Sequence, residues 1–184
     1  MGKNKAEMNW HGKEQQYHLA DLLGFYCDEV FISCGKNQEH NINIAYKTIP
    51  DLQENASPME AILNAFEKYP DKSWLVVACD LPLLDKQTLD YLAVQRDETK
   101  IATTFVSPED TLPEPLIAIW ELVSYSLLKL SYQENHLSLR KVLIAKDTQI
   151  IKAPNADALI NANTPEDAGK IEKLIGLKNT SFIR

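Results

Sequence analysis

A carboxylate at the end of an apolar run is the strongest chemical signal in this sequence. Residues 74–79 are apolar throughout, and Asp80 follows them directly, before Leu81 and Pro82. Two interpretations are open for Asp80. An Asp before Leu-Pro is a good turn residue, and a carboxylate at the end of a buried strand is also a metal ligand. Such an oxygen ligand suits Mg²⁺, which keeps waters and takes substrate phosphates as further ligands.

Other polar residues stand at the boundaries of expected elements. Lys5 follows a Gly-containing segment, so it either lies across phosphate groups or belongs to a solvated basic start. Asp51 comes directly after Ile49-Pro50. Asn161 and Asn163 precede a helix start, where Asn either caps and turns the chain or presents amide groups to a ligand.

The elements that would position these residues alternate between strands and helices. Strands are expected at about 29–34, 45–50, 74–80, 100–106, 115–120 and 148–153, and helices at about 16–25, 58–66, 86–93, 121–132, 139–145 and from 165 onward. This alternation predicts an α/β fold with three layers, in which helices cover both faces of a mostly parallel sheet. Ligands of such sheets bind at the carboxyl ends of the strands, where Asp80 is expected.

Composition narrows the class of protein. The 184 residues fit a single domain, 1–184, and the formal net charge of -7 argues against a nucleic-acid partner. Three cysteines without a C-x-x-C pair argue against a disulfide framework and a four-ligand zinc site. Because the start has no apolar signal-peptide region and no apolar run nears about 20 residues, we expect a cytoplasmic protein without a membrane partner. The four histidines show no ligand spacing and are expected to be surface or structural residues.

Taken together, segments along most of the chain resemble one known family. They are Met1–Lys5, Gly12–Lys13, Ser57–Ile62, Cys79–Pro82, Glu114–Ala118, Ser138–Arg140 and Asn161–Asp167. These are similar to the MGxDK, GKP, GPLAGI, CDxP, EPLxAL, SLR and NxNTPED motifs of the molybdenum cofactor guanylyltransferases, which belong to the MobA-like NTP transferase family. Only Cys79–Pro82 and Asn161–Asp167 are fairly specific, and both favour the guanylyl branch of the family over its cytidylyl branch.

The resemblance implies a Rossmann-like nucleotidyltransferase fold and transfer of GMP from GTP to molybdopterin, with release of pyrophosphate. It implies catalytic roles for Lys5 and Asp80, nucleotide contacts from Lys5, Asp51 and Asp80, and Mg²⁺ as the cofactor bound by Asp80. Asn161 and Asn163 would face the pterin. Other molybdenum-cofactor biosynthesis proteins or molybdoenzymes are the implied protein partners.

One family feature has no counterpart in the sequence. The glycine-rich loop LAGGxSxR is absent, and no Gly-Gly pair occurs anywhere in the chain. Met1 aligns inside that loop, so we expect the true start to lie upstream and the first strand of the sheet to be missing from this sequence. Two alternatives stay open: a cytidylyltransferase acting on the same or another phosphate acceptor, and a non-catalytic truncated relative.

Overall fold

The computed structural model describes the backbone of residues 5–181 and the side chains of 5–164 and 166–176. The helices are α1 (Gln15–Leu23), α2 (Pro58–Lys68), α3 (Lys86–Val94), α4 (Ser124–Gln133), α5 (Leu139–Ala145) and α6 (Pro165–Ser181). The strands are β1 (Phe31–Cys34), β2 (Lys47–Pro50), β3 (Trp74–Val77), β4 (Ala102–Val106), β5 (Pro113–Trp120) and β6 (Gln149–Ile151). Three short 3₁₀ helices are η1 (Lys5–Glu7), η2 (Glu39–Asn41) and η3 (Ala156–Leu159). Within this part of the chain, no helix is long and apolar enough to span a bilayer.

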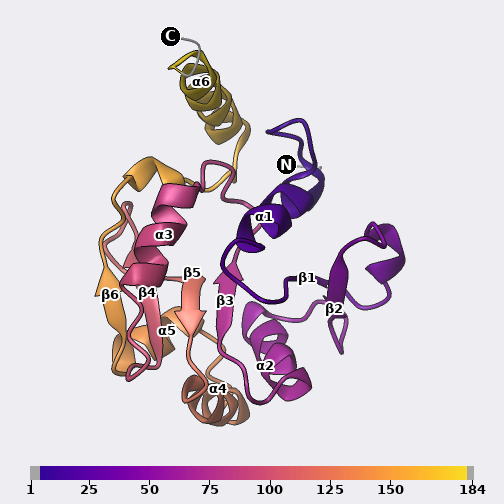
Figure 1. Ribbon diagram of the computed structural model, residues 1–184. Helices are drawn as coiled ribbons and strands as arrows, with labels where there is room; N and C mark the ends of the chain where they lie inside the picture. Colours follow the sequence, from indigo (N-terminus) through magenta and orange to yellow (C-terminus); the bar gives the residue numbers. More distant parts are fainter. Residues whose placement is uncertain (1–4, 182–184) are drawn as a thin grey trace.

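The strands form two sheets. One has four strands in the order β3-β5-β4-β6, and the other contains only β1 and β2, which are parallel (Figure 1). In the larger sheet β4 and β6 are parallel, whereas β5 is antiparallel to both of its neighbours. The predicted α/β class is confirmed. The expected mostly parallel sheet is instead a mixed one, because β5 returns antiparallel from β4 after a short connection.

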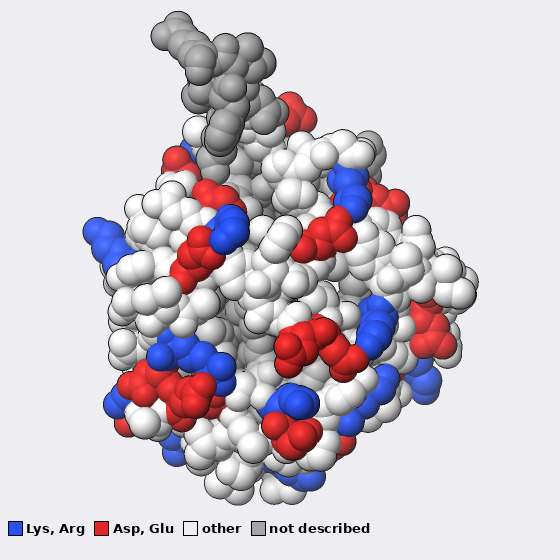
Figure 2. All heavy atoms as spheres, viewed as in Figure 1, with Lys and Arg blue, Asp and Glu red and all other residues white. Residues whose placement is uncertain are grey.

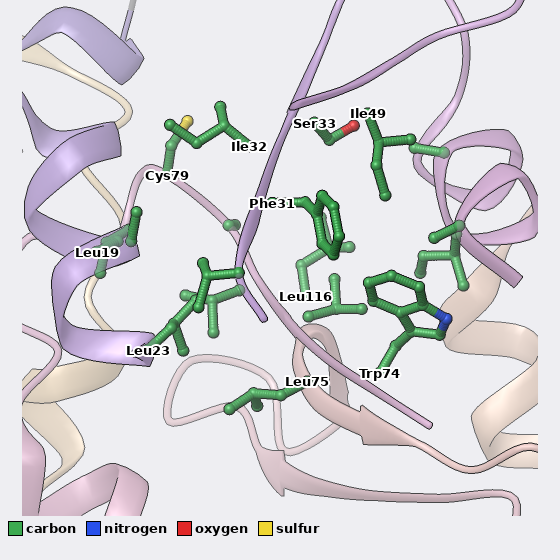
Figure 3. A pocket seen from close by; sticks show the side chains of 18 of the residues that line it. Leu19, Leu23, Phe31, Ile32, Ser33, Ile49, Trp74, Leu75, Cys79 and Leu116 are labelled. Atoms are coloured by element: carbon green, nitrogen blue, oxygen red, sulfur yellow. The ribbon is translucent and has the colours of Figure 1, made fainter. Parts of the chain in front are cut away.

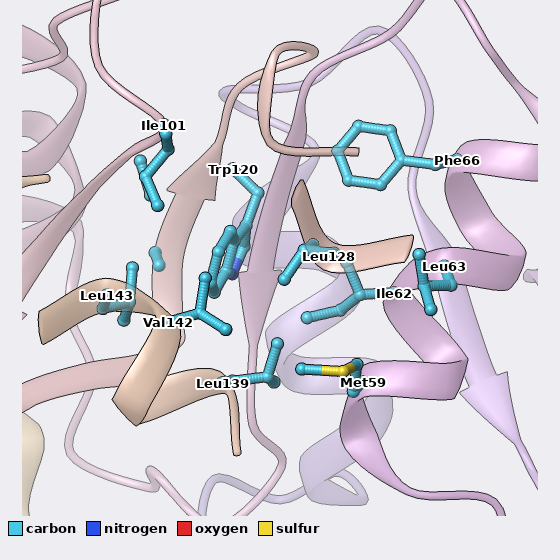
Figure 4. Packing of buried hydrophobic residues seen from close by; sticks show 12 residues of the cluster. Met59, Ile62, Leu63, Phe66, Ile101, Trp120, Leu128, Leu139, Val142 and Leu143 are labelled. Atoms are coloured by element: carbon cyan, nitrogen blue, oxygen red, sulfur yellow. The ribbon is translucent and has the colours of Figure 1, made fainter. Parts of the chain in front are cut away.

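Helices cover both faces of the larger sheet, as predicted. Along β5, Ala118 and Trp120 point to one face, and Ile117 and Ile119 point to the other, as the two-residue period of a strand requires. The first face packs against α2, α4 and α5, and Figure 4 shows Trp120 surrounded by side chains of these helices. The second face packs against α1 and α3. The fully buried Trp120 donates its indole N–H to the Pro115 carbonyl at 3.1 Å, so its polar atom is satisfied.

Local capping residues set the helix starts. Ser57 and Glu60 form a capping box at the start of α2, with Pro58 at the first helical position. The expected cap of α6 is also confirmed: the Asp167 amide donates to Thr164 Oγ1 at 3.1 Å, and the Thr164 amide donates to Asp167 Oδ2 at 2.8 Å. These caps fix where the loops at Asp51 and at Asn161–Asn163 join their helices.

Charge on the surface is mixed. On the face in Figure 2, basic and acidic side chains are interspersed among uncharged ones. Surfaces that bind duplex nucleic acid instead gather Lys and Arg on one face.

Candidate active site

Asp80 lies directly beyond the end of β3. The Ala78 amide still donates to the Leu116 carbonyl of β5 at 2.7 Å, and the chain then turns away from the sheet. Leu81, Leu83 and Leu84 are buried after the turn, whereas the Asp80 side chain keeps 22% of its surface exposed. The turn therefore anchors its apolar residues in the core and leaves the carboxylate at the sheet edge, as the sequence predicted.

Two residues from the N-terminal segment hold this turn in place. Gln15, which is fully buried at the start of α1, donates from Nε2 to the Leu81 carbonyl at 3.2 Å. His11 Nε2 lies 2.7 Å from the Pro82 carbonyl oxygen, and because a carbonyl only accepts, Nε2 must carry the proton. His11 is thus a structural residue, as expected. Sequence reasoning missed Gln15, since nothing distinguishes it from any Gln in the first turn of a helix.

The loop before α6 lies beside the same turn. The Ala162 amide donates to the Asp80 carbonyl at 2.9 Å, which attaches the segment from Asn161 to Asn163 to the end of β3. The Asn163 amide donates to Asp167 Oδ2 at 3.2 Å, so the helix cap also orients this loop. The loop that carries the two predicted Asn residues is therefore held by the backbone amides of Ala162 and Asn163.

Three of the predicted site residues make direct contact. Lys5 Nζ donates to Asp80 Oδ2 at 3.1 Å and also to Asn163 Oδ1. These residues are 75 and 158 positions from Lys5 in the sequence, so only the fold brings them together. Figure 1 shows the N-terminal segment and the start of α6 on the same side of the molecule, beyond β3. The Lys5–Asp80–Asn163 cluster thus combines a cation with two oxygen acceptors at one sheet edge.

The cluster directs two oxygen atoms of the kind that hard cations bind at a single point. Asp80 and Asn163 direct a carboxylate oxygen and an amide oxygen at one point, which the Lys5 ammonium group occupies. No group of three or more His, Cys, Asp or Glu side chains gathers for a metal among the residues that the structure describes. One carboxylate and one amide fit Mg²⁺, because this ion binds through few protein ligands and completes its shell with waters and phosphates.

The cysteine next to Asp80 is unsuited to nucleophilic catalysis. Burial, and to a lesser degree the neighbouring Asp80 carboxylate, raise the pKa of the Cys79 thiol above its ordinary value. The reactive form of a cysteine is the thiolate, which becomes scarcer as the pKa rises. The chemistry of this edge therefore depends on charge and hydrogen bonding and not on a covalent intermediate at Cys79.

Asp51 does not join the cluster. It follows β2, where its amide donates to the Cys34 carbonyl at 2.8 Å. Its side chain lines a separate cavity of about 290 Å³ between α2 and α4, together with Glu60, Asn64 and Tyr132. Asp51 Oδ1 is buried and has no hydrogen-bond partner among the residues described, and burial, followed by the nearby Glu60, raises the pKa of the carboxyl group. The carboxylate is thus available to a ligand that donates hydrogen bonds.

The arrangement of these residues agrees with a comparison of the sequence with known families. Residues 1–150 match the family described as MobA-like NTP transferase domain. The chain belongs to this family. The resemblance inferred from the CDLP and NxNTPED motifs is therefore confirmed.

Named relatives of this MobA-like domain support the assignment. The molybdenum cofactor biosynthesis bifunctional protein of Synechocystis sp. is 32% identical over 93% of this chain, which spans 50% of that relative's length. The molybdenum cofactor guanylyltransferase of Pseudomonas entomophila is 26% identical over 90% of this chain and 87% of its own. This chain therefore corresponds to about half of the first relative and to most of the second.

The fold is shared with a solved structure of the same kind. The crystal structure of molybdopterin-guanine dinucleotide biosynthesis protein A from Archaeoglobus fulgidus superimposes with a TM-score of 0.73. The match covers 95% of this chain and 92% of that one, at 18% sequence identity. At this identity the likeness establishes the nucleotidyltransferase fold alone, and the activity is argued separately below.

Proposed function

We propose that this MobA-like domain, residues 1–184, is a cytoplasmic guanylyltransferase that transfers GMP from GTP to molybdopterin. The observation that carries the proposal is the convergence of Lys5, Asp80 and Asn163 at the carboxyl end of β3. Ligands of open α/β sheets bind at that end. The names of the Pseudomonas and Synechocystis relatives point to molybdenum cofactor biosynthesis, so other proteins of that process or molybdoenzymes are the proposed protein partners.

The proposed reaction is a single displacement at phosphorus. An oxygen of the molybdopterin phosphate forms a bond to the α-phosphorus of GTP, the bond from that phosphorus to the bridging oxygen breaks, and pyrophosphate leaves with the electron pair. Such transfers need positioning and charge neutralisation more than covalent help from the protein. The Lys5 ammonium group would bind phosphate oxygens and offset the charge that grows on the leaving pyrophosphate.

Asp80 and Asn163 would hold Mg²⁺ through their oxygens, and the ion would neutralise phosphate charge. Asp80 also keeps Lys5 at the edge of the sheet through their ion pair, whose groups are 22% and 35% exposed. Asn161 and Asn163 would present amide groups to the pterin from the loop that Ala162 attaches to Asp80. These roles need no group outside the cluster and its adjoining loop.

Asp51 would read the base. Guanine presents two adjacent donors, its ring N–H and its amino group, to a carboxylate, whereas cytosine presents only an amino group on the equivalent edge. The Asp51 carboxylate has a buried, unpartnered oxygen that complements such donors. Asp51 follows β2 of the smaller sheet and Asp80 follows β3 of the larger one, and an extended nucleotide would have to span from one to the other.

The test compares nucleotides in binding and in turnover. Calorimetry should give tighter binding of GTP than of CTP, by about 10- to 100-fold for one charge-assisted bond of roughly 1.5–3 kcal/mol. Pyrophosphate release should require molybdopterin and GTP together. The variant Asp51→Asn should lose that preference. The matched variant Asp147→Asn changes a carboxylate that is 75% exposed and should retain the preference.

Equal binding of GTP and CTP would refute base reading by Asp51, and preferred turnover of CTP would make the protein a cytidylyltransferase. Binding of GTP without pyrophosphate release at any Mg²⁺ concentration would identify a non-catalytic relative.

A further inference from the structure

Lys5 binds the same two oxygens that the proposed reaction assigns to Mg²⁺. Its ammonium group donates to Asp80 Oδ2 at 3.1 Å and also to Asn163 Oδ1. A Mg²⁺ ion bound to both oxygens would lie in the same place, at about 2.1 Å from each of them. Two cations do not share such a place, because like charges repel strongly at short separation. Lys5 and the metal ion therefore compete for one pair of oxygens.

The turn at Asp80 is held by bonds that do not involve Lys5. Gln15, which is fully buried, donates from Nε2 to the Leu81 carbonyl at 3.2 Å. The Ala162 amide donates to the Asp80 carbonyl at 2.9 Å, which attaches the loop before α6 to the same turn. Departure of the Lys5 ammonium group would therefore leave the Asp80 carboxylate at the edge of the sheet.

The residues next to the two oxygens are held in place as well. Cys79, which precedes Asp80, lies with Leu19 of α1 on the wall of an apolar cavity of about 330 Å³ (Figure 3). The Asn163 amide donates to Asp167 Oδ2 at 3.2 Å, in the cap of α6. The backbone that carries both oxygens is thus fixed by packing on one side and by the helix cap on the other.

Lys5 is the member of the cluster that can move. Its side chain is 35% exposed, against 22% for the Asp80 side chain. It begins η1, a short 3₁₀ helix in which no residue is buried. A lysine ammonium group is carried by a flexible four-carbon stem and is strongly attracted to phosphate oxygens. The group can therefore turn from its two acceptors to a neighbouring anion without disturbing packed residues.

We propose that Lys5 is an exchangeable cation of this site. It neutralises Asp80 and occupies Asn163 until a metal-bound polyphosphate arrives, and its ammonium group then moves from these two oxygens to phosphate oxygens. The proposal rests on the proposed function for the role of the metal ion and the phosphates. It adds an order of binding, in which the metal ion enters with the nucleotide and not before it.

The exchange couples the two ligands through Lys5. A metal ion that binds alone displaces the ammonium group with no anion to receive it, so its affinity is reduced by the lost ion pair with Asp80. A polyphosphate removes this penalty because it accepts the ammonium group. Coupling of this kind is reciprocal, so the metal ion raises the affinity for the polyphosphate by the same factor.

The first test measures binding of Mn²⁺ in the absence of any nucleotide, by electron paramagnetic resonance of the full chain. Binding at the site is the part that Asp80→Asn removes. Lys5→Met should bind Mn²⁺ at this site about fivefold more tightly, the change expected for loss of a competing, partly solvated ion pair. Lys86→Met, which breaks an exposed pair with Asp90 on α3, should leave the affinity unchanged. Equal or weaker Mn²⁺ binding by Lys5→Met would overturn the proposal.

The second test measures binding of pyrophosphate by calorimetry with EDTA present. Asp80→Asn releases Lys5 from its ion pair, so it should bind pyrophosphate about fivefold more tightly than the unaltered protein. The gain should disappear in the double variant that also carries Lys5→Met, because the released ammonium group is then absent. A gain that persists in the double variant would come from lost repulsion by the carboxylate alone and would overturn the proposal.

A third measurement needs no variant. In nitrogen-15 NMR spectra of the unaltered protein, the hydrogen-bonded ammonium signal of Lys5 should be lost as Mg²⁺ is added together with pyrophosphate, whereas a signal that keeps its place at saturation would overturn the proposal. Mn²⁺, Mg²⁺ and pyrophosphate carry neither a base nor an acceptor. Failure of the exchange would therefore appear in these binding measurements, and failure of the proposed guanylyl transfer would appear in the nucleotide preference and in turnover.

Discussion

Replacing Asp80 by Asn keeps the size of the side chain and removes its charge. The change in stability should be small, because the ion pair of Asp80 with Lys5 is partly solvated, at 22% and 35% exposure, and Asn still accepts a hydrogen bond from Lys5. Such pairs contribute about 1 kcal/mol or less. For a protein of 184 residues this corresponds to a melting temperature lower by about 2–4 °C.

The effect of Asp80→Asn on activity should be much larger. If the carboxylate holds Mg²⁺ against the phosphates, its loss removes one preorganised electrostatic contact at the reacting groups. Removing a contact of that kind typically lowers turnover by about 100- to 1000-fold. The assay is pyrophosphate release from GTP in the presence of molybdopterin, measured across a Mg²⁺ titration. The variant should need more Mg²⁺ and should reach a lower maximum.

Asp90→Asn is the matched control. Asp90 also pairs with a lysine, Lys86 at 2.8 Å, but it lies on the exposed side of α3. The control should retain turnover and its Mg²⁺ dependence. Full Mg²⁺-dependent turnover of Asp80→Asn would refute the metal role. A variant that fails to fold would instead show that Asp80 acts through the turn after β3.

Two further predictions concern stability. Arg96→Met should lower the free energy of unfolding, measured in urea, by about 3 kcal/mol. The reason is that Glu121, which is 4% exposed, loses the guanidinium group that donates two hydrogen bonds to its carboxylate. Lys86→Met, in an exposed pair, should cost about 1 kcal/mol at most, and an equal loss in both would refute the burial argument. Burial, followed by His11, lowers the pKa of His18 to about 4, so the unfolded chain binds a proton between pH 6.5 and 4 that the folded protein does not. The free energy of unfolding that neutral His18 contributes should be fully present above pH 6.5 and should fall by about 1–2 kcal/mol as the pH drops to 4, given solvent screening. The variant His18→Gln should lose less stability over this range. An identical pH dependence in the variant would contradict the prediction.

Local sequence signals predicted much of the fold because they depend on neighbours in the chain. The capping residues Ser57 and Thr164 mark helix starts through bonds to residues three positions on. The apolar run before Asp80 predicted a buried strand with a carboxylate at its end. The structure has the strand and the carboxylate, but each residue of β3 is partly exposed. Strand ends were predicted less well, since β3 stops at Val77, three residues before the predicted end at Asp80.

Contacts between residues far apart in the sequence could not be predicted from local patterns. Gln15 supports the turn at Leu81 across 66 positions, yet its residue type carries no sign of burial. The antiparallel direction of β5 depends on pairing with β3 and β4, which an apolar strand sequence does not encode. Asp51 was predicted to share a nucleotide site with Lys5 and Asp80, and the structure separates it into a cavity of its own without deciding that role.

The sequence by itself determined which chemical groups this protein offers and, through its motifs, the family to which it belongs. Residue types and short spacings carry that information because turns, caps and strand ends are built from local hydrogen bonds. Only the tertiary structure decided that Lys5, Asp80 and Asn163 meet, since packing of α1 and of the loop before α6 around the end of β3 brings them together. The pairing of β1 with β2 and of β3 with β5 was likewise visible only in three dimensions, because strand pairing is a relation between segments and not a property of either one.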